Sequence, residues 1–379
     1  MLVIVGGLGK MIRSFEIHNF KLFETLALDG LGAVTLVGGR HNVGATALLE
    51  AAFLFCDQLN PEMLLKPITW RGLQAIAGPE SVFASCFYRY KTTRPIRLAA
   101  IDESGSRGLE IVLDPANTTR RIVFNAENKL PPPGPSAGPQ PAGPGAAAAP
   151  LSVEPALHLK YLQDNKVVNT ADIVIKNGRL EMRFSSPPNK LPPTICLPAR
   201  VPANPKAEAE RYGELEIMQQ TELVLDLVRT ADPQIQSLSA IHMGGAGLIH
   251  ADIGLGRKIP IPFLGDTVGR LLSLILAMSS APHGMVLVDE LANACPEALL
   301  PQVLRKLVAA ADHFNCQVLA TTRQMNLPSS VSTALAELRP TDFAYFHLDR
   351  TAEGSVVRRY SPHDVPTEAS GREPAPRSS

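Results

Sequence analysis

Residues 271–320 alternate between helix-like and strand-like segments, and this alternation constrains the fold more than any other feature of the sequence. Segments 271–278 and 297–311 have the apolar spacing and the length of helices. Segments 285–288 and 317–320 are short apolar runs, which are typical of strands buried on both faces. Strands separated by helices in this way usually belong to a parallel sheet. We therefore expect an α/β fold with a mixed central sheet.

The rest of the chain predicts a strand-rich first part and a helical second part. Residues 11–40 contain two strand-like runs, 80–125 contain more of them around a charged turn at 102–105, and 47–55 is rich in Ala and Leu like a helix. Residues 206–230 have helical spacing, and the Pro-rich stretch 186–205 resembles a surface loop. We expect hairpins at 235–253, around Gly244 and Gly245, and at 345–360.

Composition sets the domain boundaries. Residues 130–150 are almost entirely Pro, Gly and Ala, and such a stretch buries too little to order itself, so we expect a disordered insertion between two strands. Residues 361–379 are polar and predict a frayed tail. Residues 1–10 carry no basic region and no cleavage site, which indicates a mis-annotated leader before Met11 rather than a secretion signal. One domain, 11–360, remains.

Charge and cysteine content narrow the class of protein. Lys+Arg and Asp+Glu both number 36, which argues against a dedicated nucleic-acid binder but not against a local basic patch. The five cysteines are far apart and form no metal-ligand motif, so we expect reduced thiols in a cytoplasmic protein. No apolar run approaches the roughly 18–20 residues of a membrane span, so we expect no membrane association.

A glycine-rich segment at 38–46 follows one predicted strand and precedes a predicted helix. Gly39, Gly44 and Thr46 have the spacing of a phosphate loop, in which glycines let backbone N–H groups face the phosphates and a hydroxyl binds Mg²⁺. Position 45, where such loops have lysine, is Ala45. A plain connection between strand and helix is the alternative interpretation.

Asp289 and Glu290 come directly after the apolar run 285–288. In phosphoryl chemistry the first acid of such a pair holds Mg²⁺ and the second polarises the attacking water. The alternative is a pair of helix-starting acids after a core strand. Two nearby segments favour the chemical reading: Gly265-Asp266-Thr267 precedes a helix, and the strand at 317–320 leads through two threonines to Arg323.

The order and spacing of these motifs resemble those of predicted AAA-type ATPases of the RecF/OLD/SMC class, which have an ABC-type head. The resemblance covers residues 11–360, without the insertion, and begins with the strand MIRSFEIHNFK at 11–21. It implies a P-loop ATPase head with a β-rich first lobe and a helical second lobe. It also implies ATP and Mg²⁺ as ligands.

The resemblance assigns roles residue by residue. It implies nucleotide contacts for the loop, for the first strand's end and for the signature segment: Gly39, Asn42, Gly44, Ala45, Thr46, Lys21, Gly265, Asp266 and Thr267. Thr46 and Asp289 would bind the metal, Glu290 would be the general base, and Arg323 would take the place of the H-loop histidine. Gln58 and Gln74 are both candidates for the Q-loop glutamine.

Four departures from the family pattern predict weak or absent hydrolysis. Ala45 removes the lysine, Thr267 replaces a signature glycine, Arg323 replaces a histidine, and 291–293 replaces an acid-rich stretch. The stretch after Arg323 is short and 206–230 has no sustained heptads, so we expect neither an OLD-type nuclease domain nor an SMC arm.

By resemblance, the head would form an ATP-dependent homodimer and act in DNA repair or phage defence with a separate effector or nuclease protein, with DNA itself a candidate partner. Two alternatives stay open. One is an active ATPase in which Arg323 and another cation replace the lysine. The other is a pseudo-ATPase scaffold that binds no nucleotide.

Overall fold

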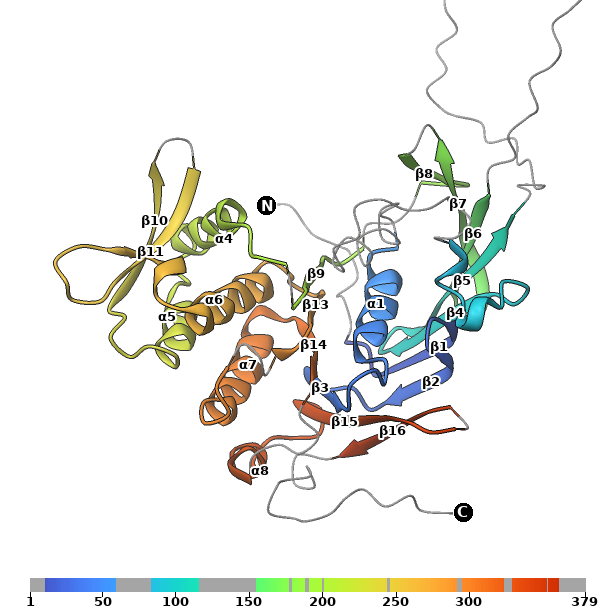
Figure 1. The fold of residues 1–379 in the computed structure, drawn as a ribbon. Helices are drawn as coiled ribbons and strands as arrows, with labels where there is room; N and C mark the ends of the chain where they lie inside the picture. Colours follow the sequence, from blue (N-terminus) through green and yellow to red (C-terminus); the bar gives the residue numbers. More distant parts are fainter. Residues whose placement is uncertain are drawn as a thin grey trace, which may run out of the picture.

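The computed structural model describes residues 11–58, 83–115, 155–176, 179–187, 191–199, 201–243, 246–291, 295–323, 329–352 and 354–360. These residues form a mixed α/β fold with helices on both faces of a central sheet (Figure 1). The predicted leader (1–10), insertion (130–150) and tail (361–379) lie outside the described residues.

The central sheet has the strand order β16-β15-β3-β14-β13-β9. Its strands are β3 (Val34–Gly39), β9 (Thr194–Leu197), β13 (Met285–Val288), β14 (Gln317–Thr322), β15 (Phe343–Arg350) and β16 (Ser355–Tyr360). All neighbours pair in parallel except β16, which pairs antiparallel with β15 at one edge. Every residue of β3, β13 and β14 is buried, as expected for parallel strands covered by helices on both faces.

A second, antiparallel sheet forms the first lobe, in the order β2-β1-β4-β5-β6-β7-β8. Its strands are β1 (Ser14–Phe20), β2 (Phe23–Asp29), β4 (Ile96–Asp102), β5 (Gly105–Asp114), β6 (Ala156–Gln163), β7 (Lys166–Lys176) and β8 (Arg179–Phe184). One row of paired residues crosses five of these strands and is buried throughout: Leu26, Ile17, Leu98, Leu109 and Tyr161. Helix α1 (Ala45–Cys56) lies between this sheet and the central sheet (Figure 1).

The second lobe packs on the other face of the central sheet. It contains α4 (Pro205–Ile217), α5 (Glu222–Arg229), α6 (Asp266–Ser279) and α7 (Leu300–Phe314), with a small sheet of β10 (Ser237–Met243), β11 (Ala246–Asp252) and β12 (Ile259–Pro260). α8 (Ser329–Leu335) packs on α7, and short 3-10 turns occur at η2 (Tyr88–Tyr90) and η3 (Ile261–Phe263). Asn204 begins α4, because its Oδ1 accepts the backbone N–H groups of Lys206 and Ala207.

The structure confirms the predicted α/β class, with its strand-rich first lobe and helical second lobe. It also confirms the helices in the 47–55, 271–278 and 297–311 regions, the strands at 285–288 and 317–320, and both predicted hairpins. The strands predicted in 80–125 are β4 and β5, which pair around the charged turn.

Two local predictions were wrong. Residues 186–205 are not simply a loop, because β9 lies within them and pairs in parallel with β13. Residues 11–40 hold three strands, since β2 was missed. Residues 206–230 are helical, as predicted, and form two helices, α4 and α5, with Gln219 between them in a left-handed conformation (φ 58°).

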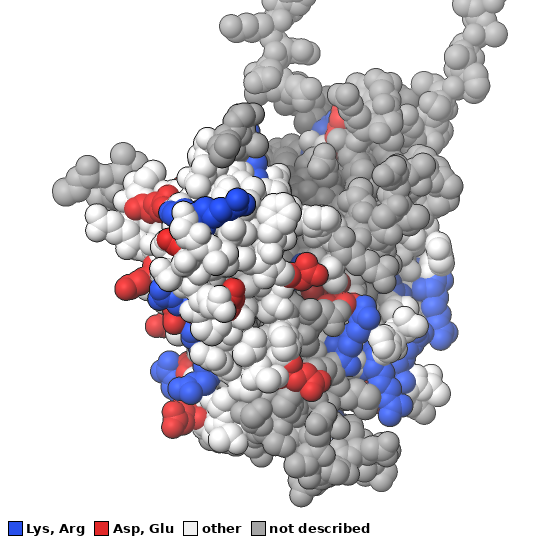
Figure 2. All heavy atoms as spheres, turned by 60° about the vertical axis from the view of Figure 1, so that its left-hand side comes forward, with Lys and Arg blue, Asp and Glu red and all other residues white. Residues whose placement is uncertain are grey.

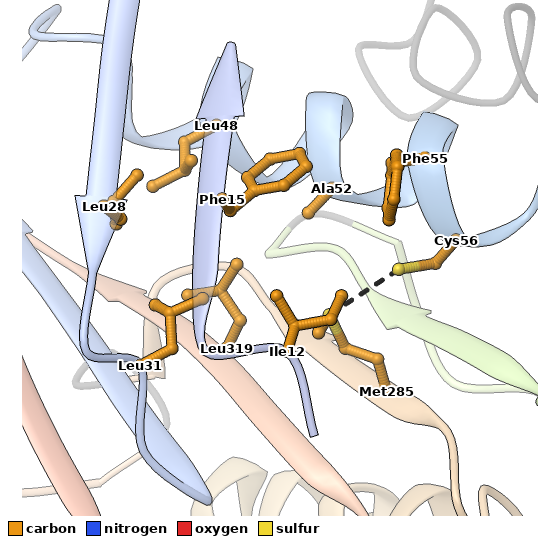
Figure 3. Close-up of a pocket in the computed structure, with 10 residues that line it drawn as sticks. All are labelled: Ile12, Phe15, Leu28, Leu31, Leu48, Ala52, Phe55, Cys56, Met285 and Leu319. Carbon is orange, nitrogen blue, oxygen red and sulfur yellow. Dashed lines mark hydrogen bonds between the residues drawn. The ribbon is translucent and has the colours of Figure 1, made fainter. Parts of the chain in front are cut away.

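Ten apolar residues from α1, from the two sheets and from their connections line a small cavity (Figure 3): Ile12, Phe15, Leu28, Leu31, Leu48, Ala52, Phe55, Cys56, Met285 and Leu319. The cavity that they enclose has a volume of about 10 Å³, at the lower limit for a single water. Cys56 Sγ lies 3.9 Å from Met285 Sδ, and burial raises the pKa of the Cys56 thiol to about 11. This pocket is therefore part of the core rather than a ligand site.

All five cysteines lie within the described residues and none forms a disulfide. Within the same ranges, no helix has the length and apolar character needed to cross a membrane.

Candidate functional site

The glycine-rich turn (38–44), the acid pair Asp289 and Glu290, and Arg323 lie at the carboxyl edge of the central sheet. β3, β14 and β13 are parallel neighbours, so their carboxyl ends lie side by side. β3 leads into the glycine-rich turn and α1, β13 leads into Asp289 and Glu290, and β14 leads into Arg323. Ligand sites of open α/β sheets usually lie at this edge.

The glycine-rich turn has a backbone that only particular residues can adopt. Gly44 has φ 110° and Asn42 has φ 62°, in the left-handed region that glycine and asparagine tolerate best. A Cβ on Gly39 would lie 2.4 Å from the carbonyl oxygen of Leu348, and a Cβ on Gly44 would lie 2.7 Å from Cζ of Phe23. The neighbouring strands therefore require glycine at both positions.

Helix α1 starts immediately after Gly44, which makes no side-chain cap. The N-terminus of a helix carries a partial positive charge of roughly half an electron and directs N–H groups outward, which suits an anion. Ala45 is the first helical residue and is half-buried. Its methyl group adds no charge to this end of the helix.

A chain of hydrogen bonds connects the first turn of α1 to the end of β13. Thr46 Oγ1 donates to Asp289 Oδ1 at 3.4 Å, and Thr321 Oγ1 donates to the same oxygen at 2.8 Å. The backbone N–H of Glu290 donates to Thr321 Oγ1 at 3.0 Å. From the sequence, Thr321 was only one of the hydroxyl residues expected at the end of β14, with no role of its own. Thr321 holds the turn that carries both acids.

Glu290 and Arg323 form an ion pair. Glu290 has a left-handed backbone (φ 56°) and a side chain that is 15% exposed, whereas the Arg323 side chain is 45% exposed. The expected general base therefore has a cation against its carboxylate.

Lys21 lies beside α1, in the turn between β1 and β2. Its Nζ lies 2.5 Å from Oε2 of Glu50, whose side chain is almost fully buried. Glu50 is four residues after Thr46, so the two lie on one side of α1 a turn apart. Lys21 is thus close to the first turns of α1, and its ammonium is engaged by Glu50.

Gly265, Asp266 and Thr267 begin α6 on the second lobe. Gly265 precedes the helix with φ 102°, Gly265 and Asp266 are exposed, and Thr267 is half-buried. The neighbouring Phe263 is 80% exposed. The structure thus presents this helix start on the surface.

Arg270, in the second turn of α6, was missed by the sequence reasoning. Its guanidinium donates to three backbone carbonyls, those of Pro198 (2.9 Å), Leu197 (3.3 Å) and Asp289 (2.9 Å). Burial lowers the pKa of Arg270, and the nearby Asp289 opposes that shift. Arg270 therefore joins the signature helix to the end of β13. The available signal was that Arg270 is the single Lys or Arg of α6.

Mg²⁺ fits the oxygen atoms of this site. Mg²⁺ is usually held by one or two carboxylates together with substrate phosphates and waters, and Thr46 Oγ1 and Asp289 Oδ1 lie 3.4 Å apart. Among the described residues, no group of three or more His, Cys, Asp or Glu could hold a metal by itself. Metal binding here would depend on phosphate oxygens.

Neither Q-loop candidate joins the site. Gln58 follows the last turn of α1, and a helix of 12 residues places it about 18 Å from the glycine-rich turn. Its carbonyl accepts a hydrogen bond from the Tyr161 hydroxyl at 2.9 Å. Gln74 lies outside the described residues.

In the left part of Figure 2, over the second lobe, acidic and basic side chains lie side by side, whereas Lys and Arg side chains gather at the right of the view. The second lobe therefore presents no single sign with which to attract a polyanion.

No family model and no curated protein matches the sequence. Solved structures of SMC heads are similar in fold. An SmcHead bound to the C-winged helix domain of ScpA is 12% identical with a TM-score of 0.46, and the match covers 92% of this chain and 97% of that one.

Two further SMC heads give comparable values. The SMC head domain from Thermotoga maritima is 11% identical with a TM-score of 0.38, covering 92% of this chain and 99% of that one. The Smc head domain with an extended coiled coil, bound to the C-terminal domain of ScpA and derived from Pyrococcus furiosus, is 10% identical with a TM-score of 0.45, covering 92% and 96%. At these scores the likeness assigns neither an activity nor a partner to this chain.

Proposed function

We propose that this chain is an ABC-type ATPase head that binds ATP with Mg²⁺ at the N-terminus of α1 and hydrolyses it slowly or not at all. The observation that carries the proposal is the hydrogen bond between Thr46 and Asp289. It brings together a hydroxyl from the first turn of α1 and the carboxylate that follows β13, although the two are far apart in the sequence. Their oxygens are the kind that Mg²⁺ uses beside phosphates.

The residues at the carboxyl edge of the central sheet each have a role in this proposal. The N–H groups at the start of α1 bind the phosphates, and Gly39 and Gly44 keep side chains out of the turn. Thr46 and Asp289 hold Mg²⁺, which would neutralise charge on the phosphates. Thr321 orients Asp289, and Glu290 is the group that would accept a proton from water.

Two features of the chain support slow hydrolysis. Ala45 leaves the phosphates without the lysine of the loop, and charge-assisted contacts of this kind contribute about 1.5–3 kcal/mol. Arg323 forms an ion pair with the carboxylate of Glu290, so the base has to lose this partner before it can receive a proton, which adds a step to hydrolysis.

The proposed partners and biological process rest on the family resemblance. We place the chain in an ATP-dependent homodimer in which Gly265–Thr267 of one protomer would meet the nucleotide of the other. We also place it in DNA repair or phage defence, beside a separate effector protein, in the cytoplasm. The five cysteines without disulfides support a reducing compartment.

A titration with fluorescent ATP, with and without Mg²⁺, tests the proposal. We expect saturable binding that Mg²⁺ strengthens, and Thr46→Ala should remove most of the Mg²⁺ effect. Thr341→Ala is the matched control, because the Thr341 hydroxyl also donates to an aspartate, Asp342, at 3.4 Å. Thr341 precedes the amino end of β15, away from the proposed site. Absence of binding in the wild type would favour the scaffold alternative. Rapid phosphate release would favour the active ATPase.

A further inference from the structure

The two partners in the Glu290–Arg323 ion pair differ in their freedom to move. Glu290 is fixed by its left-handed backbone and by the hydrogen bond from its N–H to Thr321. Arg323 lies just beyond β14 on a long side chain that is 45% exposed. If the pair opens, Arg323 is the residue that changes its position.

A nucleotide at the glycine-rich turn would compete with Glu290 for this guanidinium. Thr46 contacts Asp289, and Asp289 adjoins Glu290, so phosphates at the start of α1 would lie near the ion pair. A terminal phosphate offers more negative charge than a carboxylate and accepts two parallel N–H bonds from arginine. A partly exposed Arg–carboxylate ion pair changes an equilibrium constant by about fivefold at most. Moving the Arg323 guanidinium from Glu290 to the phosphate would therefore be favourable.

We propose that Arg323 distinguishes nucleoside triphosphates from diphosphates, and that the Arg323–Glu290 ion pair opens when the γ-phosphate takes the guanidinium. This inference rests on the proposed nucleotide binding. A diphosphate, held by α1 through its β-phosphate, leaves the pair closed. A triphosphate opens it and exposes the carboxylate of Glu290 to water. The ion pair thus makes the base available only when the substrate is present.

The test compares affinities for a non-hydrolysable ATP analogue and for ADP, both with Mg²⁺, by calorimetry on the full chain. Because neither ligand turns over, differences report binding alone. The variants are Arg323→Gln, Arg323→Lys, Glu290→Gln and the double variant Arg323→Gln/Glu290→Gln. Arg339→Gln is the matched control, because Arg339 forms an ion pair with Asp342 (2.8 Å) at the far end of β15. Circular dichroism checks that each variant is folded.

We expect the wild type to prefer the triphosphate by about tenfold or more, the range of one charge-assisted contact. Arg323→Gln should abolish this preference, and Arg323→Lys should keep part of it because a point charge replaces the planar guanidinium. Glu290→Gln removes the competitor, so the affinity for the triphosphate should rise by up to about fivefold while that for ADP stays the same. When Arg323→Gln is already present, adding Glu290→Gln should produce no such rise in triphosphate affinity.

Three results would overturn the inference. If the wild type binds the triphosphate analogue and ADP with equal affinity, Arg323 does not distinguish them, although the proposed nucleotide site stands. A rise in triphosphate affinity from Glu290→Gln that persists in the double variant would also overturn the inference. Absence of binding for either ligand would overturn the proposed function and this inference together.

Discussion

The substitution Ala45→Lys tests where the phosphates lie. Ala45 is the first residue of α1, directly after Gly44 and directly before Thr46. A lysine there would extend its ammonium toward the end of the helix that the proposed phosphates contact. One charge-assisted contact contributes roughly 1.5–3 kcal/mol, which corresponds to a gain of about 10- to 150-fold in affinity for ATP.

The same substitution should slightly destabilise the protein without nucleotide. A positive charge at a helix N-terminus opposes the helix dipole by about 0.3–1 kcal/mol, and lysine has a marginally lower helix propensity than alanine. The expected loss is about 1 kcal/mol, or about 2 °C in melting temperature for a domain of this size. ATP with Mg²⁺ should more than reverse that loss.

Calorimetric titration of ATP at low ionic strength measures the gain, and Ala309→Lys is the control. Ala309 lies on α7 and is exposed, so Ala309→Lys adds the same positive charge away from the carboxyl edge of the central sheet. If Ala45→Lys and Ala309→Lys both change the ATP affinity by less than about twofold, the phosphates do not lie at the start of α1. The interpretation of residues 39–46 as a phosphate loop would then be wrong in function.

Further substitutions test other parts of the structure. Phosphate release should stay low in Ala45→Lys and become appreciable only when Thr267→Gly is added, and a double-mutant cycle should show coupling. Arg270→Met should weaken protection from hydrogen exchange at the end of β13, because the carbonyl of Asp289 loses its donor; unchanged protection would contradict this. Gln317→Leu should lower the free energy of unfolding by about 3 kcal/mol in denaturant titrations, because its side chain bonds three buried backbone groups. Burial lowers the pKa of the His347 imidazole in the folded protein, so on acidification the unfolded chain binds this proton at a higher pH than the folded chain does. The free energy of unfolding should therefore fall as the pH drops below about 6.5, and His347→Phe should flatten this dependence.

Local sequence patterns predicted the elements that hold the site. The run at 285–288 is apolar at every position, and such a run fits few places other than a strand buried on both faces. The glycines at 39 and 44 indicated a tight turn between strand and helix, and the structure has one. These predictions succeeded because each depends on neighbouring residues alone.

Predictions that depend on tertiary contacts failed or were not made. β9 has only four residues between prolines, and its pairing with β13 provides the reason for it to be a strand. The roles of Thr321 and Arg270 come from hydrogen bonds to Asp289, which lies far from both in the sequence. Arg323 was expected to replace the H-loop histidine or, with another cation, the loop lysine. Its ion pair with Glu290 was not predicted, because that pair depends on how β13 and β14 align.

The glycines of the turn do not by themselves separate an ATP-binding head from a scaffold that binds no nucleotide. Gly39 is required by the carbonyl of Leu348, and Gly44 by the ring of Phe23, so the fold needs both whether or not phosphate is present. The Thr46–Asp289 pair is different. Thr46 is exposed and Asp289 is only half-buried, and a bond of 3.4 Å between them contributes little to stability. Packing therefore gives no reason for this hydroxyl and carboxylate to face each other, whereas Mg²⁺ between them and a phosphate does. For this reason Thr46→Ala should leave the melting temperature nearly unchanged while weakening Mg²⁺-dependent binding of ATP, and a loss of stability with no effect on binding would favour the scaffold.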